Sequence, residues 1–130
     1  LADGATLITH EKIMTHGSQV AETYFEIDLD GEDCGAHIVS RSVAKDKSRQ
    51  HFVSHINGNN LCSGHTECDA IIMDNASVVA IPKIIANNTE ASLIHEAAIG
   101  KIAGEQLIKL MTLGLTEAQA EEEIVNGFLK

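Results

Sequence analysis

Three residues in the middle of the chain have the spacing of metal ligands: Cys62, His65 and Cys68 form a Cys-x2-His-x2-Cys motif. Zinc prefers thiolate and imidazole ligands, and a closed structural zinc site needs four of them. On a regular strand, however, residues three apart point to opposite faces. The three side chains can meet only if Ser63 and Gly64 form a turn. The motif therefore has two interpretations: a metal half-site, or buried cysteines beside a surface turn.

Other motifs that would indicate an enzyme are missing. The sequence has no glycine-rich phosphate loop, so we do not expect the chain to hydrolyse ATP. A zinc protease motif would need a second histidine where Ile99 follows His95 and Glu96. We therefore expect a protein that is not an enzyme.

Short strands with polar corners dominate the first hundred residues. After Tyr24, residues Phe25, Ile27 and Leu29 alternate with acidic residues, which is the period of a half-buried strand. Further short apolar stretches are found at 36–43, 51–56, 70–73, 78–81 and 91–94, separated by turns rich in Asn and Asp. This pattern is typical of a sandwich, a barrel or a coil of stacked strands, and periodicity alone does not separate the three.

The pattern becomes helical from about residue 100. Apolar residues recur at helical spacing between Leu107 and Met111, and Gly114 is placed to end this helix in a left-handed conformation. Thr116 and Gln119 form a capping-box pattern at the start of a second helix. We expect residues 1–99 and 100–130 to be the strand and helix parts of one structural unit.

The composition restricts the binding partners and the cellular location that we expect. Nine Lys and Arg against nineteen Asp and Glu give a net charge of −10, which opposes binding to nucleic acid or to an anionic membrane surface. No apolar run approaches the roughly 18 residues of a membrane span. Three cysteines without a secretory signal favour reduced thiols. We expect a soluble cytoplasmic protein and, because the chain begins with Leu1 rather than Met, a fragment of a longer one.

Several segments resemble the SufB/SufD family of iron–sulfur cluster assembly proteins. The most specific are a His-Glu-Ala step at 95–97, a Gly-Leu corner at 114–115 and an Asn-Gly-Phe terminus at 126–128. Segments 40–46, 67–73, 81–84 and 87–88 are also similar to the family in order and approximate spacing. The resemblance extends over residues 36–130 and is weaker before them.

The resemblance implies a mainly β fold, a right-handed parallel β-helix with a C-terminal pair of α-helices. It implies a homo- or heterodimer with a SufB/SufD-like subunit and docking of a SufC-type ATPase, whose ATP-driven dimerisation would shift the two β-helices. The terminal helices would carry the docking surface, for which the candidate residues are Leu107, Leu110, Met111, Ile124 and Phe128.

The resemblance also implies ligands for a transient iron–sulfur cluster or iron. His95 and Glu96 match the family's His-Glu-Ala step, so they are candidate ligands at a subunit interface; the alternative is a hydrogen-bonded histidine where strands give way to helix. The family's scaffold subunit usually has a cysteine where this chain has Ala86, and a methyl group cannot bind metal. Three functions stay open: an assembly scaffold or its partner subunit, a cluster-free interaction module of the same family, or a small zinc or thiol protein using Cys62, His65 and Cys68.

Overall fold

A computed structural model describes all residues, 1–130, and shows seven strands followed by two helices. The strands are β1 (Thr6–Thr15), β2 (Val20–Leu29), β3 (Cys34–Ala44), β4 (Arg49–Gly58), β5 (Cys62–Ile72), β6 (Ser77–Ala86) and β7 (Ala91–Gly100). The helices are α1 (Gly104–Thr112) and α2 (Glu117–Leu129).

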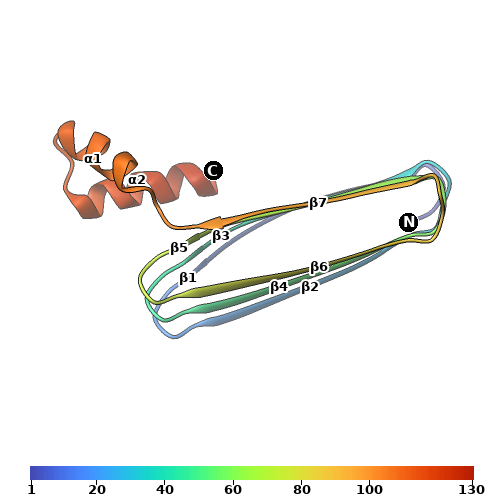
Figure 1. Cartoon of the computed structure of the whole chain (residues 1–130), viewed down its shortest axis with the longest axis horizontal. Coiled ribbons are helices and arrows are strands. Elements are labelled where there is room, and N and C mark those ends of the chain that lie inside the picture. The colour runs from blue at the N-terminus through green and yellow to red at the C-terminus, as the bar shows by residue number, and fades with distance from the viewer.

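The strands form two parallel sheets that face each other, with the chain alternating between them (Figure 1). One sheet has the order β1-β3-β5-β7 and the other the order β2-β4-β6. Each strand lies beside the strand one coil earlier, so Thr6 pairs with Gly35 and Cys34 with Cys62. These pairs are 29 and 28 residues apart, which is the length of one coil. The predicted β-helix of stacked strands is confirmed.

The corners of the coil repeat one conformation because their residues accept a left-handed backbone. Gly17, Asp46 and Asp74 occupy equivalent corners with φ of 58°, 59° and 55°. Glycine adopts this region freely, and aspartate tolerates it better than most residues do. Each aspartate also binds the corner of the coil below, since Asp46 Oδ2 accepts from the Gly17 amide at 2.8 Å and Asp74 Oδ2 from the Asp46 amide at 3.1 Å. The corners thus keep successive coils in register.

The core lies between the two sheets and consists of small and aliphatic side chains. Its fully or almost fully buried members include Leu29, Ile38, Ile56 and Cys68. Gly64 also faces inward: a Cβ at this position would lie only 2.9 Å from Leu93 Cδ2. Neighbouring side chains therefore fill the space at this position, and only a very small residue lets the sheets pack closely here.

The helices lie beyond the end of β7 rather than over the open end of the coil (Figure 1). A capping box starts α2 as expected: Gln119 N donates to Thr116 Oγ1 at 3.2 Å, and Thr116 N to Gln119 Oε1 at 2.9 Å. Gly114 has a φ of 96°, as expected for the residue that ends α1. Because α2 packs against β3, the edges of β6 and β7 stay uncovered.

Most strands are longer than the apolar stretches of the sequence indicated, and one strand was missed. Strand β1 was not predicted, and β5 starts at Cys62 instead of near residue 70. Both strands place polar or small residues inside the coil, such as Glu11 in β1 and Thr66 in β5. Such inward residues remove the apolar alternation by which a strand is predicted.

No helix of the structure is long and apolar enough to cross a membrane.

Candidate functional site

The most concentrated group of ionisable side chains lies on the outer face of the β1-β3-β5-β7 sheet. The register places His37 of β3 beside His65 of β5, and Glu67 of β5 beside Glu96 of β7. His65 and Glu67 are two residues apart on one strand, so both point outward. The parallel pairing therefore brings four residues from three coils together at one place, named here the outer histidine cluster: His37, His65, Glu67 and Glu96.

Every side-chain ion pair in the molecule belongs to this cluster. His65 Nε2 lies 3.2 Å from Glu96 Oε2 and 3.5 Å from Glu67 Oε1, and His37 Nε2 lies 3.7 Å from Glu67 Oε1. The two imidazole rings stack, with centroids 4.8 Å apart and an angle of 5° between the planes. His37 Nε2 is shielded from solvent and has no hydrogen-bond partner. The nitrogens of His37 and His65 and an oxygen of Glu67 all lie within 4.8 Å of one another.

His95 lies on the opposite, inward side of β7, at the open end of the coil. Its register neighbour is Thr66, which is 1% exposed. Both ring nitrogens of His95 are shielded and neither has a hydrogen-bond partner. Burial lowers the pKa of His95, and the nearby His65 lowers it further. The imidazole is therefore neutral near pH 7 and can act as a metal ligand.

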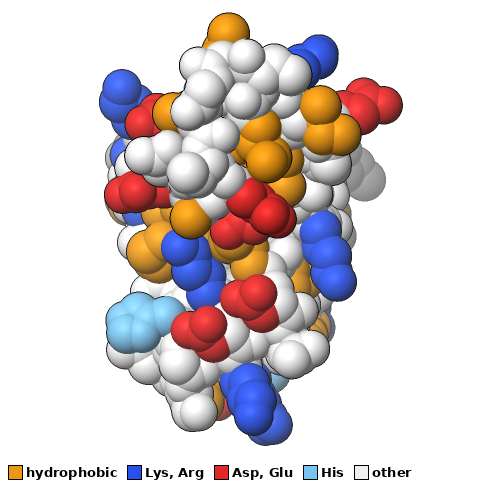
Figure 2. Space-filling model, turned by 90° about the vertical axis from the view of Figure 1, so that its left-hand side faces the viewer, with side chains coloured by type: hydrophobic (Ala, Val, Ile, Leu, Met, Phe, Trp, Pro, Cys, Tyr) orange, Lys and Arg blue, Asp and Glu red, His pale blue; other side chains and the backbone are white.

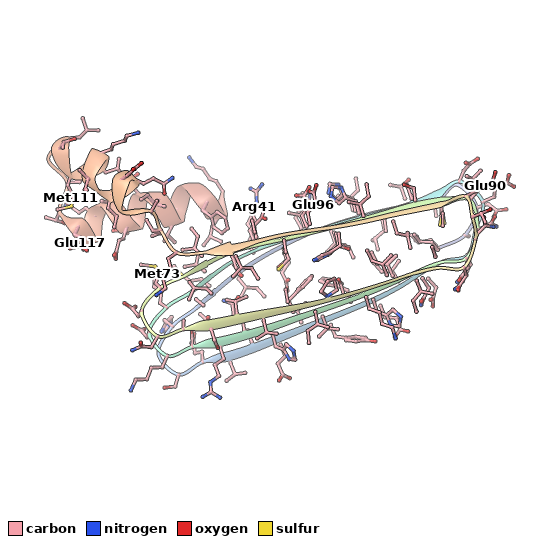
Figure 3. The ribbon with its side chains drawn as sticks, in the orientation of Figure 1. Arg41, Met73, Glu90, Glu96, Met111 and Glu117 are labelled. Carbon is pink, nitrogen blue, oxygen red and sulfur yellow. The ribbon has the colours of Figure 1, made fainter.

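Glu96 points outward from the sheet, away from the interior (Figure 3). The structure therefore does not bring His95 and Glu96 together, because adjacent residues of a strand alternate in direction. Glu96 instead joins the outer histidine cluster through His65. The two candidate ligands share the edge strand but lie on its two faces.

The structure does not bring Cys62, His65 and Cys68 together either. All three lie on β5, and Ser63 and Gly64 continue the strand without a turn. Both thiols are buried inside the coil, while His65 belongs to the outer face. Burial, then Asp69 and Glu11, raise the pKa of Cys68 to about 11, so this thiol is protonated and a poor ligand at neutral pH.

The predicted docking residues lie on both helices, and most of them are half-buried. Leu107, Leu110, Ile124 and Phe128 are half-buried, whereas Met111 is exposed. Beside Met111 the structure exposes Ile108 (63%) and Leu113 (80%). Figure 2 shows hydrophobic side chains gathered over the helical end of the molecule, among acidic ones. We refer to Ile108, Met111 and Leu113 as the helical patch.

Ala86 is the last residue of β6 and is exposed at the same open end as His95. Its register neighbour is Gly58 on the previous coil. The methyl group thus stands near the interior edge of the last coil, where a cysteine would have offered a thiolate.

Sequence reasoning missed His37 and Glu67 as site residues. Each has a register neighbour of its own residue type one coil away, since His65 is 28 residues after His37 and Glu96 is 29 residues after Glu67. Recurrence of histidine and glutamate at the coil period was the available signal. It is invisible to motif searches, because these compare residues a few positions apart.

Comparison with known proteins gives a consistent family. The family model described as "SUF system FeS cluster assembly, SufBD core domain" matches residues 1–128. An iron–sulfur cluster assembly SufBD family protein of Methanothermobacter thermautotrophicus is 40% identical over 103 residues, which is 78% of this chain and 25% of the relative. One from Archaeoglobus fulgidus is 33% identical over 130 residues, covering 97% of this chain and 34% of the relative.

A protein of Bacillus subtilis described as iron–sulfur cluster assembly protein SufB is 37% identical over 97 residues, which is 72% of this chain and 21% of that protein. The chain therefore spans about a fifth to a third of the length of these relatives.

Proposed function

Because this chain belongs to the SufB/SufD family of iron–sulfur cluster assembly proteins, we propose that it is a non-catalytic assembly component in the cytoplasm. Its last coil meets a second SufB/SufD-like subunit, and its helices dock a SufC-type ATPase. The iron–sulfur cluster, or its iron, is transient cargo held between the two subunits.

One observation carries this proposal: His95 presents two shielded, unpartnered nitrogens at an open end of the coil. A buried polar group without a partner is unfavourable, so such a group is expected to gain one. The uncovered edges of β6 and β7 are also available for pairing with another chain. A second subunit at this end would cover both features.

The ligand set of one chain is incomplete for a cluster. Iron–sulfur clusters are held mainly by cysteine thiolates, with histidine as a partial substitute. On the last coil, which also carries His95, this chain has Ala86 in place of a thiol, while Cys62 and Cys68 are buried in the interior. The remaining ligands would therefore come from the second subunit, which makes dimerisation a condition of cargo binding.

Docking of the ATPase is supported by the helical patch. The patch is apolar and exposed, and the chain lacks a phosphate loop of its own. Nucleotide-driven closure of the ATPase would move the two coils relative to each other and expose His95.

Anaerobic reconstitution with iron and sulfide tests the role of His95. We expect the chain with its SufB/SufD-like partner to gain the visible absorption of a bound cluster, and His95→Ala to lose most of it. His51→Ala is the control, because His51 lies exposed on β4, on the other sheet. Identical spectra for wild type and His95→Ala would remove His95 as a ligand.

Ala86 favours a second function, a cluster-free interaction module of the same family. In that case the chain would co-purify with the ATPase and with a partner subunit but would hold no iron. A small zinc or thiol protein using Cys62, His65 and Cys68 is the least supported alternative, because β5 separates the imidazole from the two thiols.

A further inference from the structure

The outer histidine cluster has the composition of a metal site and lies apart from the interior face on which His95 stands. We propose that His37, His65, Glu67 and Glu96 bind one divalent transition-metal ion, such as Zn²⁺ or Fe²⁺, on the outer wall of the coil. Two imidazoles with carboxylates are a common donor set for these ions. The set has no thiolate, so it does not favour soft ions such as Cu⁺.

The distances between donor atoms of the outer histidine cluster are close to those between ligands of a single metal ion. Donor atoms bound tetrahedrally to one zinc ion lie about 2.1 Å from it and therefore about 3.4 Å from each other. His65 Nε2 lies 3.2 Å from Glu96 and 3.5 Å from Glu67. His37 Nε2 lies 3.7 Å from Glu67, and the donor atoms of His37, His65 and Glu67 all lie within 4.8 Å of one another, so a bound ion would draw these ligands closer together.

The stacked rings must open for both nitrogens to bind the same ion. A lone pair lies in the ring plane, and planes only 5° from parallel aim their lone pairs side by side. The final torsion of a histidine side chain has a broad energy well, so a ring can tilt at little cost. Both side chains have room to do so, because they are 43% and 33% exposed.

Charge also favours a cation at this place. Glu67 and Glu96 face the cluster without a lysine or arginine bound to either carboxylate. A bound divalent ion would compensate the two negative charges of these carboxylates. The shielded and unpartnered Nε2 of His37 would gain a ligand bond at the same time. A pocket of about 460 Å³ beside His37 and Glu67 gives access from solvent. Lys12, Arg41 and Lys130 also line this pocket, but none of them forms an ion pair with a carboxylate of the cluster.

Calorimetric titration of the whole chain with Zn²⁺ tests the proposal. We expect one ion per chain, with affinity reduced roughly tenfold or more in His37→Asn and in Glu67→Gln. The control is His51→Asn, which removes an exposed histidine from the other sheet and should bind like wild type. Equal binding by wild type, His37→Asn and Glu67→Gln would overturn the proposal, as would the absence of stoichiometric binding in wild type.

Co²⁺ absorption separates this site from one built on the cysteine motif. Ligation by nitrogen and oxygen gives only weak visible bands, whereas a thiolate adds an intense near-ultraviolet band. We expect no such band, and the same spectrum in the double variant Cys62→Ser, Cys68→Ser. An intense band that disappears in the double variant would assign the metal to the cysteines and overturn the proposal. The outcome is independent of cluster assembly, because it needs neither iron nor sulfide nor a partner subunit.

Discussion

At the scale of single residues, Cys68 shows how position inside the coil determines chemistry. Its side chain is 1% exposed, and burial, Asp69 and Glu11 together raise its pKa from 9.0 to about 11. The folded state therefore holds the thiol proton more tightly than the unfolded chain does. This preference stabilises the fold fully below pH 9, and the stabilisation is lost as the pH rises through about 11.

Replacing Cys68 with alanine should therefore destabilise the protein in a pH-dependent way. We expect the free energy of unfolding to fall by about 1 kcal/mol at neutral pH, a typical effect of a core substitution. The difference between wild type and Cys68→Ala should narrow between pH 9 and about 11, as wild type loses its proton-linked stability. Urea unfolding of both proteins at a series of pH values measures this difference in the free energy of unfolding. A difference that stays constant over this range would contradict the raised pKa.

Single residues also show what the sequence could and could not predict about the site. His95 and Glu96 were found because the His-Glu-Ala step is contiguous in the sequence. Their separation onto two faces follows from strand geometry once β7 is known to continue through residue 100. His37 was missed because the residues it meets, His65 and Glu67, lie a full coil away, and Glu67 was missed because only this pairing of coils brings a second histidine to it.

At the scale of elements, the helix ends were predicted more accurately than the strand ends, because a helix end is marked by residues that are close together in the sequence. The capping box of Thr116 and Gln119 and the helix end at Gly114 were both predicted from neighbouring residues, and both are present. Strand ends were predicted less well, because inward positions of β5 hold Gly64, Thr66 and two cysteines in place of large aliphatic residues. The coil tolerates such residues, since neighbours from the coils above and below fill the space.

The capping box gives a prediction about α2. Thr116→Ala removes the acceptor for the Gln119 amide and should destabilise the helix by about 1 kcal/mol. Because α1 buries no residue and the helices pack mainly on each other and on β3, we expect α2 to open separately from the coil. Amide hydrogen exchange in the first turn of α2 should rise about fivefold, while the strands keep their protection.

Glu123→Ala is the matched control for the capping prediction, because Glu123 is exposed on α2 and makes no cap bond. Unchanged exchange in Thr116→Ala would mean that packing, not the cap, determines the stability of the helix. Equal loss of protection throughout the strands would instead show that helix and coil unfold as one unit.

At the scale of the whole molecule, strand periodicity did not separate a sandwich from a barrel or a coil, since all three use short strands with polar corners. The parallel pairing of residues 28 or 29 apart distinguishes the coil, and it became predictable only through the family resemblance. Position in the stack then determines exposure. Ile27, Ile56 and Ile84 form one inward column, but Ile84 on the last coil is 38% exposed whereas Ile56 is 1% exposed.

This uncovered column gives the prediction that tests dimerisation. If a second subunit covers the last coil, Ile84 becomes buried in the dimer, and Ile84→Lys would place an unpaired ammonium group there. A penalty of about 3 kcal/mol or more raises the dissociation constant roughly hundredfold. Val79→Lys is the control, because Val79 is 49% exposed on the outer face of the same strand.

Sedimentation velocity over a concentration series should show dimers for wild type and Val79→Lys and monomers for Ile84→Lys. Equal association of all three chains would exclude this end as the interface, and open-ended polymers would indicate head-to-tail stacking instead of a closed dimer.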